Sequence, residues 1–345
     1  MRTQTGKPAF EAIAQNASFS TSLRHCRVPP IRHNVAMGMD RRLFLKSAAL
    51  LPGATVLSAA DEGACRLAIG TYGLQSMPLV DAIQLIAETG YDGLEVTSFE
   101  GMTGSPEALG EKSERSEVRK VIEGSGIPLG ALMAGIKPTE DDAAHAAQLE
   151  ELKRLIELAH DLSPDSPPII QTILGGKSWE DSKGLFRDRL ADWLQVAGDQ
   201  KGTISIKPHR SHAMETPENA KWLIEQLGSP KRLGMVYDYS HYSFKDPVLS
   251  ISETVQTALP ITNYIAVKDA VQVDGKVRFA LAGEGKAWDH AEIIKAFYAG
   301  GYRGDFCCEV SSQIWRAEGY DPVKATKVCY ENMAAAFERA GVSRA

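Results

Sequence analysis

Lysine, histidine and carboxylate residues stand at the ends of several short apolar segments in this sequence. Lys207 and His209 end one segment, Asp238 follows a second, and Lys268 and Glu309 end two more. Residues two apart on a strand share a face, so Lys207 and His209 are expected to point the same way. A histidine or carboxylate can act as a base, and an ammonium can polarise an oxygen. Together they suit removal of a proton next to a carbonyl group.

These side chains need a scaffold that brings them together. From Arg66 onward, short apolar runs alternate with amphipathic stretches, which is the order of strand–helix units with a parallel sheet. The expected strands are 67–71, 93–97, 128–133, 168–174, 203–208, 233–237, 262–268 and 305–310. Helical patterns lie between them, for example at 79–89, 143–162, 184–198, 217–227 and 287–299, and a last helix is expected at 322–340.

Eight strands and their crossovers in about 275 residues predict an α/β fold, a (β/α)8 TIM barrel with a parallel eight-stranded sheet. An open doubly wound sheet would normally carry a glycine-rich turn after its first strand, and residues 69–73 do not form that fingerprint. We therefore expect one barrel domain over residues 61–345. In such a barrel the reactive groups lie at the carboxyl ends of the strands.

Four motifs carry a resemblance to a known family: Gly-Tyr-Asp-Gly-Leu-Glu-Val at 90–96, Val-Tyr-Asp-Tyr-Ser-His at 236–241, Val-Lys-Asp at 267–269 and Tyr-Arg-Gly-Asp-Phe-Cys-Cys-Glu at 302–309. Each stands at an expected strand end. In this order they resemble the sugar-phosphate isomerase/epimerase group of the xylose isomerase-like superfamily, over residues 66–340.

The resemblance implies a divalent metal ion (Mn, Mg, Co or Zn) bound by residues of strands five to eight. Asp238 and Glu309 match two of the ligand positions, whereas Lys207 stands where a Glu is expected and Ala266 where a His is expected. Two arrangements remain open. Either the metal is held by His209, Asp238 and Glu309, which we favour, or Lys207 replaces the ion and polarises the substrate oxygen itself.

The resemblance further implies a sugar or polyol isomerase or epimerase that abstracts a proton next to a carbonyl. Glu309 or His209 is the expected base, and Lys207, Lys268 or a metal is expected on the oxygen. Glu95, Gln171 and His241 are expected to bind substrate, with a structural role for Glu95 in the barrel floor as the alternative. A related lyase or dehydratase and an inactive sugar-binding barrel, plugged by a buried Lys207 ion pair, remain open. His212 and His290 lie in polar stretches and are expected at the surface.

The first sixty residues differ in charge from the rest. They carry eight basic and two acidic residues, a balance of +6, so the remaining 285 residues carry −12 of the total of −6. An acidic body disfavours nucleic acid as a partner, and with it an abasic-site endonuclease. Arg41-Arg42-Leu-Phe-Leu-Lys46 before a short apolar run resembles a twin-arginine signal. We therefore expect residues 1–60 to be an export leader. After its cleavage, the protein is expected to be periplasmic and without a membrane span, and it could form an oligomer.

Overall fold

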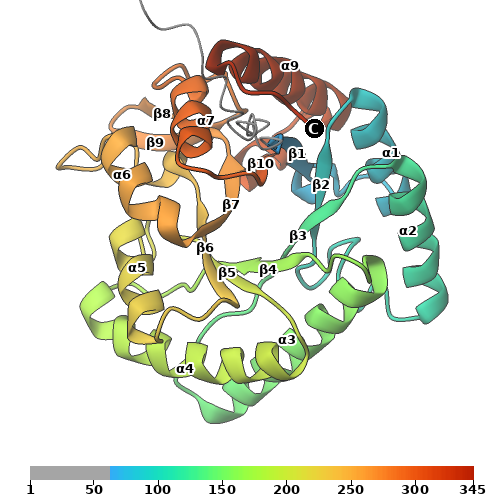
Figure 1. The fold of residues 1–345 in the computed structure, drawn as a ribbon. Coiled ribbons are helices and arrows are strands. Elements are labelled where there is room, and N and C mark those ends of the chain that lie inside the picture. The colour runs from blue at the N-terminus through green and yellow to red at the C-terminus, as the bar shows by residue number, and fades with distance from the viewer. Residues whose placement is uncertain (1–62) are drawn as a thin grey trace, which may run out of the picture. The chain divides into compact units, whose positions relative to one another are not determined.

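Eight parallel strands close into a barrel in the computed structural model, which describes residues 63–345 (Figure 1). The barrel strands are β1 (Arg66–Gly70), β2 (Gly93–Thr97), β3 (Leu129–Met133), β4 (Ile169–Thr172), β5 (Ile204–Ile206), β6 (Leu233–Tyr237), β7 (Thr262–Val267) and β10 (Asp305–Cys308). They follow one another around the ring in chain order, and β1 pairs with β10 to close it. The expected (β/α)8 TIM barrel is confirmed, with each strand within a few residues of its predicted place.

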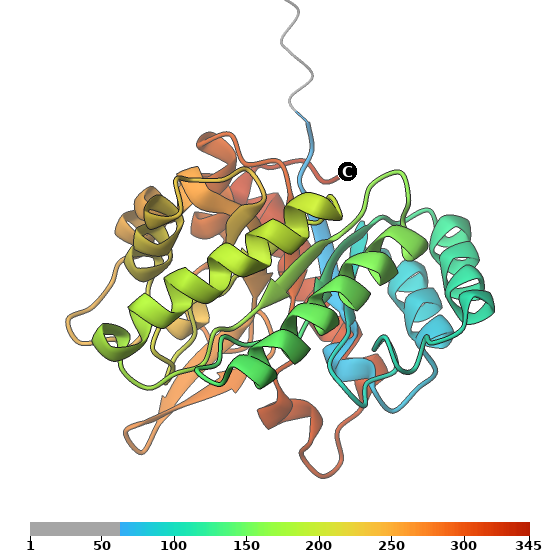
Figure 2. The ribbon, with the colours of Figure 1, turned by 90° about the horizontal axis from the view of Figure 1, so that it is seen from below.

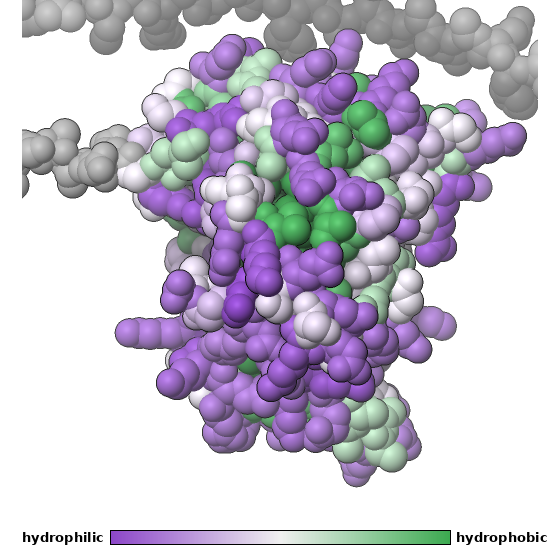
Figure 3. Space-filling model, turned by 90° about the vertical axis from the view of Figure 1, so that its right-hand side faces the viewer, coloured by the Kyte–Doolittle hydropathy of each residue, from purple (hydrophilic) through white to green (hydrophobic). Residues whose placement is uncertain are grey.

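Helices surround the barrel on its outside (Figure 1). They are α1 (Leu79–Thr89), α2 (Lys112–Ser125), α3 (Asp142–Leu162), α4 (Trp179–Asp199), α5 (Pro217–Gln226), α6 (Ile251–Ala258), α7 (His290–Ala299), the short α8 (Ser312–Trp315) and α9 (Pro322–Ala340). All of them except the short α8 bury an apolar stripe; on α1 that stripe is Leu79, Ala82, Ile83 and Ile86. Figure 3 shows the consequence on one side of the molecule, where the outer face is largely hydrophilic.

Two separate apolar clusters result from the alternation of side chains along the strands. The large cluster lies between strands and helices and contains Leu67 and Cys308. The small one contains Ala68, Tyr264 and Cys307, which point to the opposite face of the same strands, the barrel interior. Cys307 and Cys308 are therefore buried on opposite faces as free thiols.

Two helix-to-strand turns look alike in sequence and use glycine for the same reason. Gly90 ends α1 with φ of 100° and Gly301 follows α7 with φ of 93°. This left-handed conformation costs glycine little, because it has no Cβ. Each turn leads directly into a barrel strand, β2 or β10, and so helps to place Glu95 within β2 and Glu309 just after β10.

A two-stranded antiparallel hairpin interrupts the regular alternation after β7. It consists of β8 (Asp269–Val273) and β9 (Lys276–Ala280), which pair from Asp269↔Ala280 to Val273↔Lys276. The sequence analysis did not foresee it. Figure 2 shows the hairpin extending from the end of the barrel that also carries α8.

The expected export leader, residues 1–60, lies outside the described residues. Among the residues that the structure describes, no helix has the length and apolar character needed to cross a bilayer.

Candidate active site

Four charged residues stand immediately after four neighbouring strands. Lys207 follows β5, Asp238 follows β6, Lys268 follows β7 and Glu309 follows β10, and these strands are adjacent in the barrel. Parallel strands place their carboxyl ends at one mouth, so residues up to 102 positions apart in the chain come into contact.

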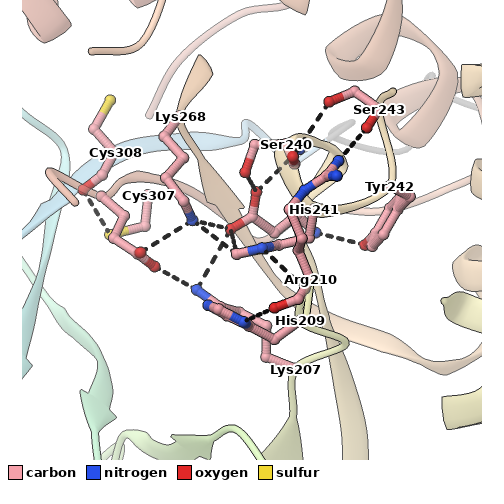
Figure 4. A network of polar contacts seen from close by, with 12 residues as sticks. Lys207, His209, Arg210, Ser240, His241, Tyr242, Ser243, Lys268, Cys307 and Cys308 are labelled. Carbon is pink, nitrogen blue, oxygen red and sulfur yellow. Dashed lines mark hydrogen bonds and ion pairs between the residues drawn. The ribbon is translucent and has the colours of Figure 1, made fainter. Parts of the chain in front are cut away.

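The four charges form a closed ring of ion pairs, visible in Figure 4. Lys207 donates to Glu309 Oε2 and lies 3.4 Å from Asp238 Oδ2. Lys268 donates to Asp238 Oδ2 and lies 3.0 Å from Glu309 Oε1. Each ammonium thus contacts both carboxylates. We call Lys207, Asp238, Lys268 and Glu309 the charge ring.

Burial and pairing control the protonation of the charge ring. Burial alone would raise the pKa of Glu309, but Lys207 and Lys268 lower it to about 2. Burial opposes ionisation of Asp238 as well, and Lys268, His241 and Lys207 hold its pKa well below the usual range. Burial lowers the pKa of Lys207, yet Glu309 and Asp238 outweigh it and raise that pKa above the ordinary value. Two anions and two cations therefore balance at neutral pH.

Two histidines stack beside the charge ring. The rings of His209 and His241 lie 3.9 Å apart between centroids. The Arg210 backbone N–H donates to His241 Nδ1 at 3.3 Å, which leaves the proton on Nε2, 3.3 Å from Asp238 Oδ2. His209 Nδ1 lies 2.8 Å from the Arg210 carbonyl and therefore carries the proton there.

Both histidines are neutral. Burial, His241 and Lys207 lower the pKa of His209 to about 2. Burial and the neighbouring Lys268 lower the pKa of His241 to about 4. With its proton on Nδ1, His209 has a lone pair on Nε2, and no residue within 63–345 makes a hydrogen bond to that atom. His209 is thus a base whose acceptor nitrogen is free.

A cavity of about 280 Å³ opens beside these groups. Lys207, His209 and Glu309 form its polar end, and Tyr72 and Phe99 belong to its apolar lining. The two aromatic rings contact each other edge to face, with centroids 5.6 Å apart. The volume lies just below the range of about 300–1,000 Å³ that is common for small-molecule pockets.

Glu95 lies behind the cavity wall. It is fully buried, and Gln171, which lines the cavity, donates its Nε2 to Glu95 Oε2. Burial and the Glu309 charge raise the pKa of Glu95 to about 8, so it is mainly protonated at neutral pH. Because Nε2 of Gln171 is turned towards Glu95, its Oε1 remains available as an acceptor for the cavity.

The expected site residues therefore fall into two shells. Lys207, His209, Glu309 and Gln171 line the cavity. Asp238, Lys268, His241 and Glu95 are absent from that lining; each is at most 1% exposed and contacts a residue that lines it or another member of the charge ring. The two shells are in direct contact.

Histidine 290 departs from the expectation of a surface position. It is buried, and its Nε2 lies 2.7 Å from Asp269 Oδ1, while Asp269 Oδ2 accepts the Gly285 N–H at 2.7 Å. The reason is the β8–β9 hairpin: Asp269 begins it, and these contacts tie its base to the start of α7.

Sequence reasoning missed several residues of the cavity. Phe99 and Lys137 both lie beyond a strand end, on the loops after β2 and β3. Phe99 lies two residues and Lys137 four residues after the end of its strand. Because barrel sites are built from such loops, this short distance could have marked both as site residues. Tyr72, just after β1, lies on the cavity wall as well.

The donor set of the charge ring does not fit a divalent metal ion. Lysine ammonium groups already contact oxygens of both carboxylates. At about 3 Å, charges of +1 and +2 repel by roughly 11 kcal/mol at an effective dielectric constant of about 20. Residues 63–345 hold no group of three or more His, Cys, Asp or Glu side chains able to bind a metal. The favoured His209–Asp238–Glu309 metal triad is thus not formed, because Lys207 and Lys268 occupy the oxygens of its carboxylates.

Comparisons with known proteins agree with the fold. The sequence profile described as "Xylose isomerase-like TIM barrel" matches residues 83–335. No curated protein sequence matches this chain.

Solved structures with the same fold have low sequence identity to it. The apo form of 3-keto-D-glucoside 4-epimerase YcjR from E. coli is 15% identical and covers 79% of this chain and 99% of its own, with a TM-score of 0.61. D-psicose 3-epimerase in the presence of D-fructose is 16% identical and covers 80% and 99%, with a TM-score of 0.62. IOLI protein with a bound zinc atom is 17% identical and covers 79% and 98%, with a TM-score of 0.65.

Proposed function

The chain belongs to the xylose isomerase-like TIM barrel family, and from this premise we propose that it is a sugar epimerase or isomerase. The observation that carries the proposal is the lining of the cavity. A histidine with a free acceptor nitrogen, an ammonium and a carboxylate line one space together with two aromatic rings. Several family structures are sugar epimerases, which supports a keto sugar as the substrate.

The reaction would begin with removal of a proton from the carbon next to the carbonyl. We assign this step to His209, because both oxygens of Glu309 are engaged by lysines whereas Nε2 of His209 is free. Its low pKa keeps the imidazole unprotonated at neutral pH. The negative charge that develops on the substrate raises that pKa during the transfer.

Lys207 would stabilise the oxygen that becomes an enolate. An ammonium has three donor protons, and two of those on Lys207 face Glu309 and Asp238. The third is available to the cavity that Lys207 lines. A fixed donor aimed at developing charge stabilises the transition state more than the ground state. Delivery of a proton from a second donor to the opposite face of the carbon would give the epimer, and return of the proton from His209 to the neighbouring carbon would give the isomer.

Solvent-isotope exchange tests this proposal. The protein is incubated in D2O with D-fructose, L-ribulose or a 3-keto-glucoside, and deuterium next to the carbonyl is followed by NMR. We expect exchange with at least one of them, and a loss of about 10²- to 10⁴-fold in the His209→Gln variant. His212→Gln is the matched control, since the His212 ring lies 4.7 Å from that of His209 without lining the cavity.

The other functions in this fold give different outcomes. Exchange accompanied by release of the group attached to the sugar would identify a lyase. Saturable sugar binding with no exchange in any of the three substrates would instead identify a sugar-binding barrel and refute the epimerase.

A further inference from the structure

We propose that Lys207 and Lys268 together take the place of a divalent cation, so that the protein works with an ammonium pair where a metal centre would otherwise stand. The role of Lys207 on the substrate oxygen rests on the proposed function, whereas the replacement of the ion does not. The inference follows from the contacts, the charge and the burial of the charge ring.

Both lysines contact the two carboxylates that a single metal ion would bind. A metal ion between Asp238 and Glu309 would draw both carboxylates to one centre. Here each ammonium reaches both of them: Lys207 lies 3.4 Å from Asp238 and is paired with Glu309, and Lys268 lies 3.0 Å from Glu309 and is paired with Asp238. Figure 4 shows the two lysines entering the network from different strands.

The charge of the pair equals that of a divalent ion. Two ammonium groups against two carboxylates leave the ring neutral, and its side chains are at most 10% exposed. Addition of a divalent ion would leave an excess of two positive charges in a buried place, which is strongly unfavourable. Removal of either lysine would leave two buried carboxylates with one ammonium between them, an uncompensated negative charge that is also unfavourable.

The two lysines have different tasks. Lys207 lines the cavity and has a donor left for substrate. Lys268 does not line the cavity. Its Nζ contacts Asp238 and Glu309, lies 3.1 Å from His241 Nε2 and faces the Phe279 ring of β9 at 5.1 Å. We therefore assign Lys268 as a positioning residue that keeps the carboxylates ionised and in place, so that Lys207 holds its orientation.

The β8–β9 hairpin shields the ammonium group of Lys268 from solvent. Phe279 also contacts the ring of His241 with 5.1 Å between centroids, and its N–H donates to Gln313 Oε1 at 3.0 Å. The aromatic ring thus covers the side of Lys268 and His241 that faces β9. An ammonium tolerates the face of an aromatic ring through cation–π attraction.

Metal binding tests the inference directly. Purified wild type, Lys207→Glu and Lys207→Glu/Lys268→Ala are titrated with Mn²⁺ by calorimetry and their metal content is measured by mass spectrometry. Lys183→Glu is the control for the charge change, since Lys183 is a surface residue paired with Glu180. We expect no stoichiometric ion in wild type or the control. The double variant should bind one ion per chain with a Kd at least 100-fold lower than any binding by wild type.

The same titration separates failure of this inference from failure of the proposed function. One tightly bound Mn²⁺ per wild-type chain, lost with EDTA together with thermal stability, would overturn the ammonium pair whatever the activity is. If wild type contains no metal ion and catalyses no deuterium exchange, only the epimerase proposal is contradicted. If the double variant does not fold, the wild-type metal content still decides.

Lys268 has a test of its own. We expect Lys268→Met to lower kcat at least 10-fold with little change in KM, because substrate contacts are retained while Lys207 loses its fixed orientation. Lys268→Arg should recover part of kcat by restoring the charge. Equal activity of Lys268→Met and wild type, in folded protein, would contradict the positioning role.

Discussion

Glu95 and His241 show how burial sets the charge state of single residues near the cavity. A Cβ on Gly70 would lie 2.7 Å from Glu95 Oε1, so glycine at this position makes room for the carboxyl group. Burial then keeps Glu95 protonated and His241 neutral at pH 7. Glu95 was expected either to bind substrate or to brace the barrel floor. Its contact with Gln171 supports an indirect role, in which it orients the amide that lines the cavity.

The buried His241 should make stability depend on pH. Its pKa is about 4 in the folded protein against 6.5 as the ordinary value, so the unfolded chain binds the proton first as pH falls. Stability from this group is fully present above pH 6.5 and is lost as pH falls from 6.5 towards 4. We expect the free energy of unfolding, measured by urea titration, to fall less steeply with decreasing pH in His241→Asn than in wild type. The two slopes should differ by up to about 1.4 kcal/mol per pH unit. Parallel curves for the two proteins would contradict this assignment.

At the scale of elements, barrel closure depends on the first and last strands. Arg66 on β1 donates to both oxygens of Asp305 on β10, at 2.6 and 2.9 Å, and Asp305 is buried. This bidentate pair stands at the seam where β1 and β10 pair. Charge-assisted bidentate bonds of this kind are stronger than ordinary surface pairs.

Arg66→Gln is therefore expected to lower the free energy of unfolding by about 2–4 kcal/mol, because it leaves the buried Asp305 carboxylate without its partner. Arg119→Gln serves as the control: Arg119 forms a 3.7 Å pair with Glu123 on α2 in which both side chains are exposed. That substitution should cost about 0–0.5 kcal/mol. Denaturant titration measures both, and similar losses would show that the Arg66 pair adds no special stability.

At the scale of the whole molecule, the charge is divided between the first sixty residues and the rest. Residues 1–60 carry +6 and residues 61–345 carry −12. We propose that this division reflects export, with Arg41 and Arg42 as the twin-arginine signal ahead of a short apolar run.

Export is tested by cell fractionation in a bacterium with an active twin-arginine pathway. The double variant Arg41→Lys/Arg42→Lys is expected to reduce the periplasmic fraction of the protein at least 10-fold. The control double variant Arg24→Lys/Arg27→Lys, which lies upstream of the motif, should leave the periplasmic fraction unchanged. An equal periplasmic fraction for the two double variants would contradict the twin-arginine assignment.

The barrel could be predicted from the sequence, because alternation of apolar strands and amphipathic helices is a local property. Lys207, Asp238, Lys268 and Glu309 were recognisable for the same reason, as each directly follows a strand. Only the tertiary structure decided their pairing, since Lys207 and Glu309 are separated by 102 positions and meet through closure of the sheet. It also brought Lys207 and Lys268 to the oxygens of Glu309 and Asp238, the two carboxylates of the expected metal site. The β8–β9 hairpin had a local signal that was overlooked, since Asp274-Gly275 stands between apolar residues that alternate with polar ones on both sides. Whether two carboxylates face a metal or a lysine has no such local signal, because it depends on which side chains reach them across neighbouring strands.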